Sequence, residues 1–343
     1  MPMVNREEFL SQLEAVRPGI DLKGDVDQSS CFVFKGGKVI TFSGEIACFH
    51  ESCLKEVEGA INAAPLLEML RQIKGENINV EMDAKSLKLQ YKRERVKFKI
   101  ESEIELPIDV IEDPGEYTKF PADFAEALAL VQECASKDES RFDLTCIHIH
   151  PKFLEAAGQF QFARYRIDTG LEKSILVKKD HLTHIIGLGM TEYSLTQTWM
   201  HFRNPSGVVL SCQWTPFEDF EFPSQDITKY LKLKGTPTSM PKGLADAAKK
   251  ANIFTAENVE SDDVDLELRP GGVKIVGKSE SGRYEKIAKI KYSGKPLSFT
   301  ISPKILQELV KKHSECEVTD SILKIDGGKW KYGTCLGSRE ESK

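Results

Sequence analysis

The segment Gly272–Ser279, GVKIVGKS, matches the phosphate-binding pattern GxxxxGK[ST] letter for letter. In a nucleotide-binding loop of this kind, backbone N–H groups and the N-terminus of a following helix surround the phosphates. The four residues between the glycines instead have the composition of a strand, and residues 280–283 that of a turn. The context favours a hairpin entered through residues 270–272, and it leaves nucleotide binding as the alternative.

Four histidines could bind a metal ion. His148 and His150 alternate on a predicted strand, and His181 and His184 share one face of a predicted helix. No Asp or Glu completes a recognised ligand spacing, and nothing in the sequence brings the two pairs together. No GxSxG, HExxH or Ser/His/Asp signature stands out either. We therefore expect no metal, no cofactor, no catalytic residues and a protein that is not an enzyme.

The composition is that of an ordinary globular chain. Its 343 residues, 40% hydrophobic and 29% charged, suffice for two or three domains. The eight cysteines form no CxxC pair, which favours free thiols in a reducing compartment. We expect a cytoplasmic protein, because no apolar run approaches the roughly 20 residues of a membrane span and the N-terminus does not resemble a secretory signal. The net charge of −6 argues against a surface that is basic all over, but it allows a basic lining.

One pattern of helix and strands recurs along the chain. Residues 64–70 and 302–310 each open a short amphipathic helix with proline in its first turn. A third copy runs from residue 177 through a helix that includes Ile186, followed by strands at 195–202 and 208–214 on either side of the turn NPSG. The strands predicted after the other two helices are 77–81, 86–90 and 96–100, and 315–319, 321–325 and 329–334.

An amphipathic helix also precedes each copy of this pattern. These predicted helices are Arg6–Val16, 121–135 and 241–251, with apolar residues at helical spacing. The strands alternate between apolar and charged residues, which is typical of an antiparallel sheet with one buried face. We predict an α+β fold of three repeated domains, 1–117, 118–230 and 231–343, each with two helices packed on antiparallel sheet.

The order of these elements and several phrases resemble the bacterial DNA polymerase III beta subunit, the sliding clamp family. The resemblance covers nearly the whole chain and is clearest at residues 4–16, at 287–294 leading into 299–309, and at Phe222-Pro223. It implies that two chains close head to tail into a ring of six similar domains around duplex DNA. The implied partners are double-stranded DNA, a replicative DNA polymerase, a clamp loader and a second copy of the chain, and the implied location is the nucleoid in the cytoplasm.

The resemblance also implies which residues make these contacts. Helices would line the hole, and their contacts to phosphate would be independent of sequence and permit sliding. The candidate DNA-contacting residues are Lys23, Arg71, Lys74, Lys137, Arg141, Phe142, Lys178, Lys179, Lys242, Lys249, Lys250, Lys311 and Lys312; the alternative for any one lysine is a solvated helix face. The seam between chains would join Phe98 and Ile100 to Ile253 and Phe254, with the core of each domain as the alternative place for all four.

The same family docks partner peptides in a hydrophobic pocket between the second and third domains. The matching positions are Leu144, Tyr165, Arg166, Ile167, Pro223, Ile227, Tyr332, Thr334 and Leu336. Family members end in an apolar tail that forms one wall of the pocket, whereas this chain ends in the polar sequence CLGSREESK. The departure implies an altered pocket, and a divergent, virus-encoded clamp would fit it. A clamp-fold interaction platform that is never loaded on DNA is a further alternative.

Overall fold

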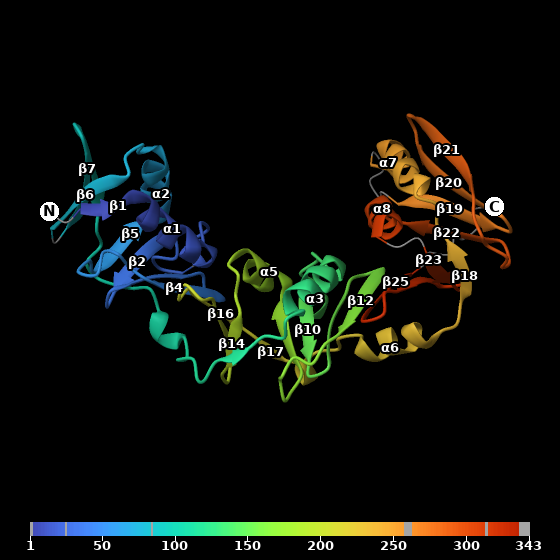
Figure 1. Cartoon of the computed structure of the whole chain (residues 1–343), viewed down its shortest axis with the longest axis horizontal. Helices are drawn as coiled ribbons and strands as arrows, with labels where there is room; N and C mark the ends of the chain where they lie inside the picture. The colour runs from blue at the N-terminus through green and yellow to red at the C-terminus, as the bar shows by residue number, and fades with distance from the viewer. Residues whose placement is uncertain (1–2, 25, 84, 257–262, 313–314, 336–343) are drawn as a thin grey trace. The chain divides into compact units, whose positions relative to one another are not determined.

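The computed structural model describes residues 3–24, 26–83, 85–256, 263–312 and 315–335 (Figure 1). The chain divides into two compact units. The first unit runs to residue 125 and resumes over 175–216, and the second unit contains 126–174 and everything from 217 onward. No helix within the described ranges has both the length and the apolar character needed to cross a membrane.

The order of elements repeats three times among the described residues: a helix, four strands, a second helix and three strands. The first copy is α1 (Arg6–Val16), β2 (Cys31–Lys35), β3 (Lys38–Phe42), β4 (Ile46–Glu51), β5 (Gly59–Asn62), α2 (Ala63–Gln72), β6 (Asn77–Asp83), β7 (Ser86–Tyr91) and β8 (Glu94–Lys99). The second copy is α3 (Phe124–Val131), β10 (Cys146–His150), β11 (Phe153–Ala157), β12 (Gln161–Arg166), β13 (Ile175–Lys178), α5 (Lys179–Gly187), β14 (Glu192–Leu195), β15 (Trp199–Arg203) and β16 (Val209–Gln213), with the short α4 (Phe142–Thr145) before β10. The third copy is α7 (Gly243–Thr255), β19 (Val264–Arg269), β20 (Gly272–Ser279), β21 (Gly282–Lys289), β22 (Leu297–Ile301), α8 (Pro303–Lys312), β23 (Glu315–Val318), β24 (Ile322–Asp326) and β25 (Trp330–Cys335).

The strands pair in the same pattern in each copy. A short strand before each copy, namely β1 (Met3–Asn5), β9 (Thr118–Lys119) or β18 (Thr236–Ser239), pairs antiparallel with the first strand after that copy's second helix. The other four strands pair in the order β5-β2-β3-β4 in the first copy and β22-β19-β20-β21 in the third. The predicted α+β fold is confirmed, and equivalent elements have equivalent neighbours.

Two antiparallel ladders join one copy to the next. In the first unit β4 pairs with β16, in a register that places Cys48 opposite Leu210. In the second unit β12 pairs with β25, with Ala163 opposite Tyr332. In the pairing order given above, β4 is the end strand of the first copy's set of four, and β12 is the end strand of the second copy's set. Each joint therefore links the end strand of one such set to the last strand of the next copy. β21 is the counterpart of β4 and β12 in the third copy, and β8 is the counterpart of β16 and β25 in the first. Both are edge strands of their four-stranded sheets.

Local signals explain where two of the helices begin. Asn5 and Asn62 cap α1 and α2, accepting hydrogen bonds from the backbone N–H groups of Glu8 and Ala64 at 3.0 and 3.2 Å. The helix predicted at 121–135 is shorter, because α3 ends at Val131 and a 3-10 turn follows. The strand predicted at 195–202 is a hairpin, since β14 and β15 are separated by a turn at 196–198.

The helices pack in pairs within each unit. In the first unit α1 and α2 are in contact, and α1 buries Phe9, Leu13 and Val16. In the second unit α7 and α8 are in contact (Figure 1), and the inner side of α7 is rich in alanine. These small side chains let β20 approach closely: a Cβ added at Gly277 would collide with the carbonyl oxygen of Ala251.

The helix α6 (Ser224–Lys232) lies between the second and third copies in the chain and follows the short β17 (Thr215–Pro216). It packs on the β12 and β25 side of the second unit, where the ring of Tyr230 stacks on that of Phe162 at 5.9 Å. Ile227 is the buried residue of this helix.

Candidate nucleic-acid interface and interaction surfaces

The candidate cations lie on helices or in the loops beside them. Arg71, Lys249, Lys250 and Lys311 are exposed on α2, α7 and α8. Two more exposed lysines, Lys74 and Lys242, flank α2 and α7, and the half-buried Lys179 begins α5. The exposed loop residues are Lys23, Lys137 and Arg141, while the side chain of Lys312 lies outside what the structure describes.

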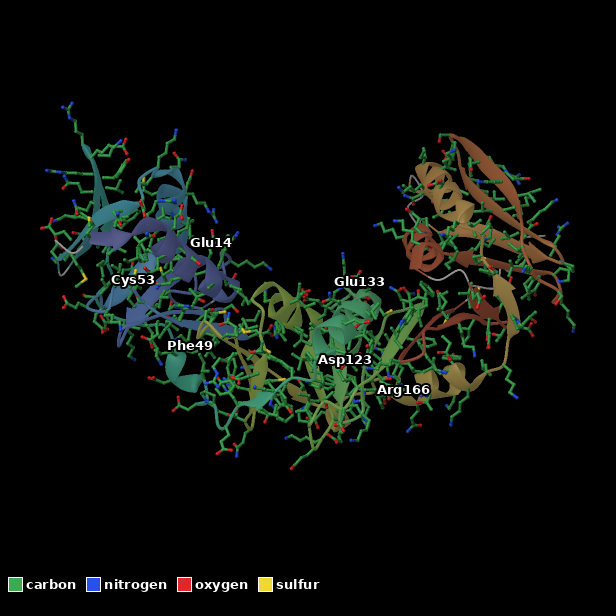
Figure 2. All side chains as sticks on the ribbon, viewed as in Figure 1. Glu14, Phe49, Cys53, Asp123, Glu133 and Arg166 are labelled. Atoms are coloured by element: carbon green, nitrogen blue, oxygen red, sulfur yellow. The ribbon has the colours of Figure 1, made fainter. Side chains whose placement is uncertain are left out.

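Within the described part of the chain, carboxylates engage at least three of these cations. Arg71 on α2 donates two hydrogen bonds to Glu14 on α1 (labelled in Figure 2), through Nε at 3.0 Å and through Nη2. Arg141 donates to both oxygens of Asp143, at 3.1 and 2.8 Å, which raises the pKa of Arg141. Such pairs reduce the positive field that a phosphate would meet.

Lys178 is the third of these cations. Its Nζ donates to both carboxylate oxygens of Glu45, at 2.9 and 2.8 Å. Phe142, the candidate aromatic residue, begins α4 and packs against Phe220, with ring centroids 5.0 Å apart. Phe142 is half-buried, so part of its ring is open to solvent.

The phosphate-loop alternative is wrong. Gly272–Ser279 is the strand β20, and all of its residues pair with β21, from Gly272 opposite Lys289 to Ser279 opposite Gly282. A two-residue turn and a strand, not a helix, follow Ser279. The backbone N–H groups are arranged in a sheet and cannot converge on a phosphate.

The two pairs of histidines lie in different units of the chain. His148 and His150 lie in the second unit, where Nδ1 of His148 is 2.7 Å from Glu155 and Nδ1 of His150 accepts the N–H of Lys152. His181 and His184 lie in the first unit, on α5. Within the described ranges, no group of three or more His, Cys, Asp or Glu side chains is arranged to hold a metal ion.

A buried charged network in the second unit holds α6 in place. The carboxylate of Glu155 is fully buried and accepts from Nε of Arg164 at 2.6 Å, while its other oxygen contacts His148. The same guanidinium donates to Thr228 Oγ1 at 3.0 Å and to the Ser224 carbonyl at 3.1 Å. One arginine therefore connects two strands of the sheet to the first turns of α6.

The residues expected at the chain-to-chain seam differ in exposure. Phe98 and Ile100 are buried in the first unit, 8% and 5% exposed, whereas Ile253 on α7 is 65% exposed. Phe254 is half-buried beside β21, where a Cβ at Gly282 would lie 2.9 Å from its ring. Phe98 and Ile100 pack within their own unit, and the outward side chains of β8 are those of Arg95, Lys97 and Lys99.

The residues expected in the partner pocket are split between two faces of one sheet. Tyr165, Tyr332 and Thr334 share one face of the β12–β25 ladder, because directly opposed residues point to the same side. Helix α6, with Pro223 just before it and Ile227 within it, lies against the other face, to which Phe162 and Arg164 point. Of the rest, Leu144 is half-buried, Ile167 is buried, Arg166 is the exposed last residue of β12 (labelled in Figure 2), and Leu336 lies outside the described residues.

Sequence reasoning missed the aromatic residues that do face α6. Phe162 stacks on Tyr230, and a Cβ at the opposed Gly333 would meet the Phe162 ring. The neighbouring Phe160 is 51% exposed, and its carbonyl accepts from Thr334 Oγ1 at 3.1 Å. Strand parity tells which residues of β12 share a face, but it does not tell which of the two faces meets α6.

The threefold element series and the two copy-to-copy joints define the clamp fold of DNA polymerase III beta subunits. Solved structures with this fold match nearly the full length of the chain. The sliding clamp (DNA polymerase III subunit beta) from Bartonella birtlesii, bound to griselimycin, matches with a TM-score of 0.82 at 17% identity, over 98% of each chain. The beta subunit from Thermotoga maritima gives 0.79 at 16%, over 98% of each chain. The beta subunit from Pseudomonas aeruginosa gives 0.80 at 15%, over 98% of this chain and 99% of that one.

The likeness is one of fold at low sequence identity. No protein-family model matches the sequence, and no curated protein matches it.

Proposed function

We propose that this protein is a DNA sliding clamp, a processivity factor without catalytic residues that encircles duplex DNA and tethers a replicative polymerase. The observation that carries the proposal is the pair of open edges. β4 and β12 each pair with the last strand of the next copy, and β21, their counterpart in the third copy, pairs with no described strand along its outer edge. β8, the counterpart of β16 and β25, is open as well.

The third joint is therefore supplied by another chain. β21 of one chain pairs with β8 of the next in the manner of the two internal joints, and two chains give a closed ring of six copies. A heterologous contact that closes in this way has no free ends. The three domains of each chain are residues 1–117, 118–230 and 231–343, one for each copy.

The seam consists of backbone ladder bonds flanked by side chains of both signs. Arg95, Lys97 and Lys99 point outward from β8. The exposed Ile253 on α7, which contacts β21, would be covered by the partner chain. Burial of this one side chain removes apolar surface that the isolated chain leaves in water.

DNA is held by enclosure and by phosphate contacts. The exposed lysines of α7 and α8, together with Lys74 and Lys179, supply positive charge that is independent of base sequence. Polymerase and clamp loader bind the aromatic surface beside α6, formed by the exposed Phe160 and the half-buried Tyr230, where an apolar anchor of a partner could pack. A location on DNA in the cytoplasm follows from this function.

The test compares retention on closed circular duplex DNA with retention on the same DNA after linearisation, together with the native mass. A clamp is a dimer that stays on circles and slides off ends. Ile253→Glu should shift the protein toward monomer and abolish retention, whereas Ile186→Glu, at an exposed isoleucine on α5, should leave both unchanged. Equal retention on linear and circular DNA would contradict encirclement and favour an interaction platform.

A further inference from the structure

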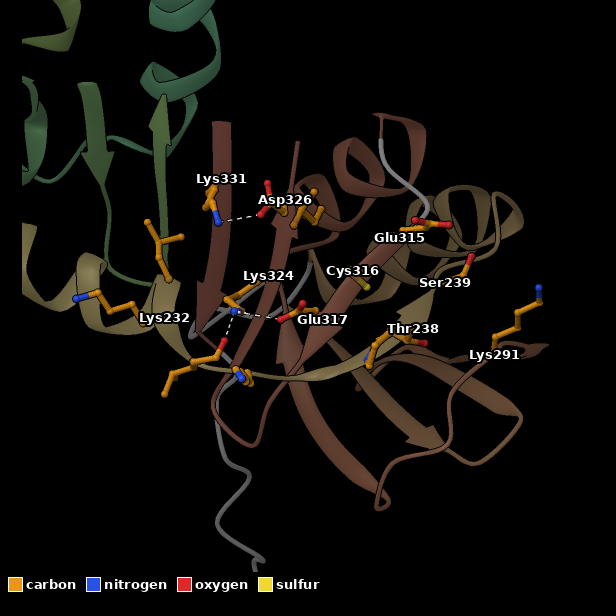
Figure 3. A pocket seen from close by; sticks show the side chains of 15 residues that line it. Lys232, Thr238, Ser239, Lys291, Glu315, Cys316, Glu317, Lys324, Asp326 and Lys331 are labelled. Carbon is orange, nitrogen blue, oxygen red and sulfur yellow. Dashed lines mark hydrogen bonds and ion pairs between the residues drawn. The ribbon is translucent and has the colours of Figure 1, made fainter. Parts of the chain in front are cut away.

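A cavity of about 590 Å³ opens on the second unit at the end of α6, between β18 and the strands β23, β24 and β25 (Figure 3). None of its lining residues belongs to the aromatic surface beside α6 or to the candidate DNA contacts. On β23 the exposed residues alternate with the buried Cys316 and Val318, so Glu315 and Glu317 point away from the core. The size lies within the range of sites that bind ligands.

The charges that line the cavity do not balance. Five lysines and three carboxylates line it, in a chain whose net charge is −6. Two of the carboxylates are already paired: Glu317 with Lys324 at 3.2 Å, and Asp326 with Lys331 at 2.8 Å. The remaining lysines, Lys232, Lys234 and Lys291, are exposed. Within the described residues none of these three has a carboxylate partner at 4.0 Å or less.

Two buried polar groups lie at the same place. Lys324 is 9% exposed and also donates to the carbonyl oxygen of Leu233, which caps α6. Thr238 is 5% exposed, and its hydroxyl has no hydrogen-bond partner among the described residues. A buried hydroxyl without a partner is unusual, because it forfeits the bonds that it makes in water. A ligand or water molecule in the cavity could supply the missing bond.

We propose that this cavity binds an acidic, extended segment of a partner protein. The carboxylates of the segment would meet Lys232, Lys234 and Lys291, and its backbone N–H groups would donate hydrogen bonds to Glu315 and Glu317. A nucleic-acid backbone fits less well, because phosphodiesters carry no hydrogen-bond donor for Glu315 and Glu317. The site lies outside the residues assigned to ring closure, to DNA and to the polymerase.

The test titrates the full-length protein against a fluorescein-labelled peptide of alternating aspartate and glycine, followed by anisotropy at low salt. The comparison probes are the same peptide with asparagine for aspartate and an oligothymidylate of equal charge. The aspartate peptide should bind at least tenfold more tightly than either probe. The triple variant Lys232→Glu, Lys234→Glu, Lys291→Glu should weaken its binding at least tenfold.

A matched control carries the same charge change on the first unit, at the exposed Lys35, Lys38 and Lys55, and should bind the peptide within twofold of the unaltered protein. Thr238→Val tests the hydroxyl and should weaken binding severalfold. Equal weakening by the control, or equal affinity for the oligothymidylate or the asparagine peptide, would overturn the proposal. Native mass and retention on circular DNA, measured on the same variants, separate its failure from failure of the clamp function.

Discussion

The ammonium group of Lys178 donates hydrogen bonds to both oxygens of Glu45, at 2.9 and 2.8 Å, across 133 positions of sequence. Glu45 lies in the turn between β3 and β4, and Lys178 ends β13, so the contact connects the first copy to the second within the first unit. His181 Nε2 lies 3.3 Å from the same carboxylate. Its hydrogen bond is the largest cause that lowers the pKa of Glu45 to about 2.

Glu45→Gln should therefore have a pH-dependent cost. Because the folded pKa lies below the ordinary value of 4.5, the carboxylate stabilises the fold above pH 4.5, and this contribution is lost as the pH falls toward 2. Glu45 is half exposed, so we expect a loss of at most about 1 kcal/mol at pH 7 that shrinks at pH 3. Urea unfolding at both pH values measures it. The exposed Glu56→Gln is the control, and an equal loss at both pH values would contradict the assignment.

Gly277→Ala should destabilise the second unit through close packing. The new Cβ would meet the backbone of Ala251 on α7, which cannot rotate away as a side chain can. We expect a loss of about 1–3 kcal/mol in the free energy of unfolding. Gly272→Ala in the same strand is the control, since its Cβ would lie 3.8 Å from the nearest atom, the Ala288 oxygen. Similar losses in both variants would point to strand propensity and not to the helix contact.

Arg164→Met should be among the most destabilising substitutions in the second unit. It leaves the fully buried carboxylate of Glu155 with His148 as its remaining side-chain hydrogen-bond partner among the described residues, and it removes the bonds from Arg164 to Thr228 and Ser224 on α6. Breaking a buried pair from one side costs about 3–5 kcal/mol. Lys152→Met breaks the exposed pair with Asp168, 2.7 Å long, and should cost less than about 1 kcal/mol. Chemical unfolding of the two variants compares them, and near-equal costs would contradict the argument.

Lys249→Glu combined with Lys250→Glu should weaken binding to duplex DNA without altering the native mass. Each phosphate contact that is lost lowers the slope of log K against log salt by roughly 0.9, so two contacts lower it by roughly 2. Equilibrium binding to a short duplex across a salt series gives the slope. Lys35→Glu with Lys38→Glu, on the exposed β2–β3 hairpin, is the control. An unchanged slope would place α7 away from DNA.

The threefold pattern was readable from sequence because its signals are local. Proline in the first turn of α8 and the apolar spacing of α1 placed both helices close to their observed bounds. The turn at 196–198 was missed because its sequence, TQT, contains neither glycine nor proline. Where local chemistry specifies the backbone, the sequence is sufficient.

The proposed partner surface could not be predicted from the sequence, because β12 is buried on both faces. Its two faces are equally buried, as Phe162 on one and Ala163 and Tyr165 on the other show. The strand therefore lacks the alternation of apolar and polar residues that would show which face meets α6. Pairs such as Arg71 with Glu14 are 57 positions apart, and no spacing rule connects them. These features depend on how distant segments meet.

The edges of β8 and β21, which pair with no further strand of the described residues, also bear on the behaviour of a single chain. An unpaired strand edge is a template on which any other exposed strand can grow, and long apolar edges aggregate. β8 carries Arg95, Lys97 and Lys99 on its exposed side, charges that discourage stacking of like chains on one another. The same charged side chains, which we propose to flank the seam, thus oppose aggregation of the solitary chain.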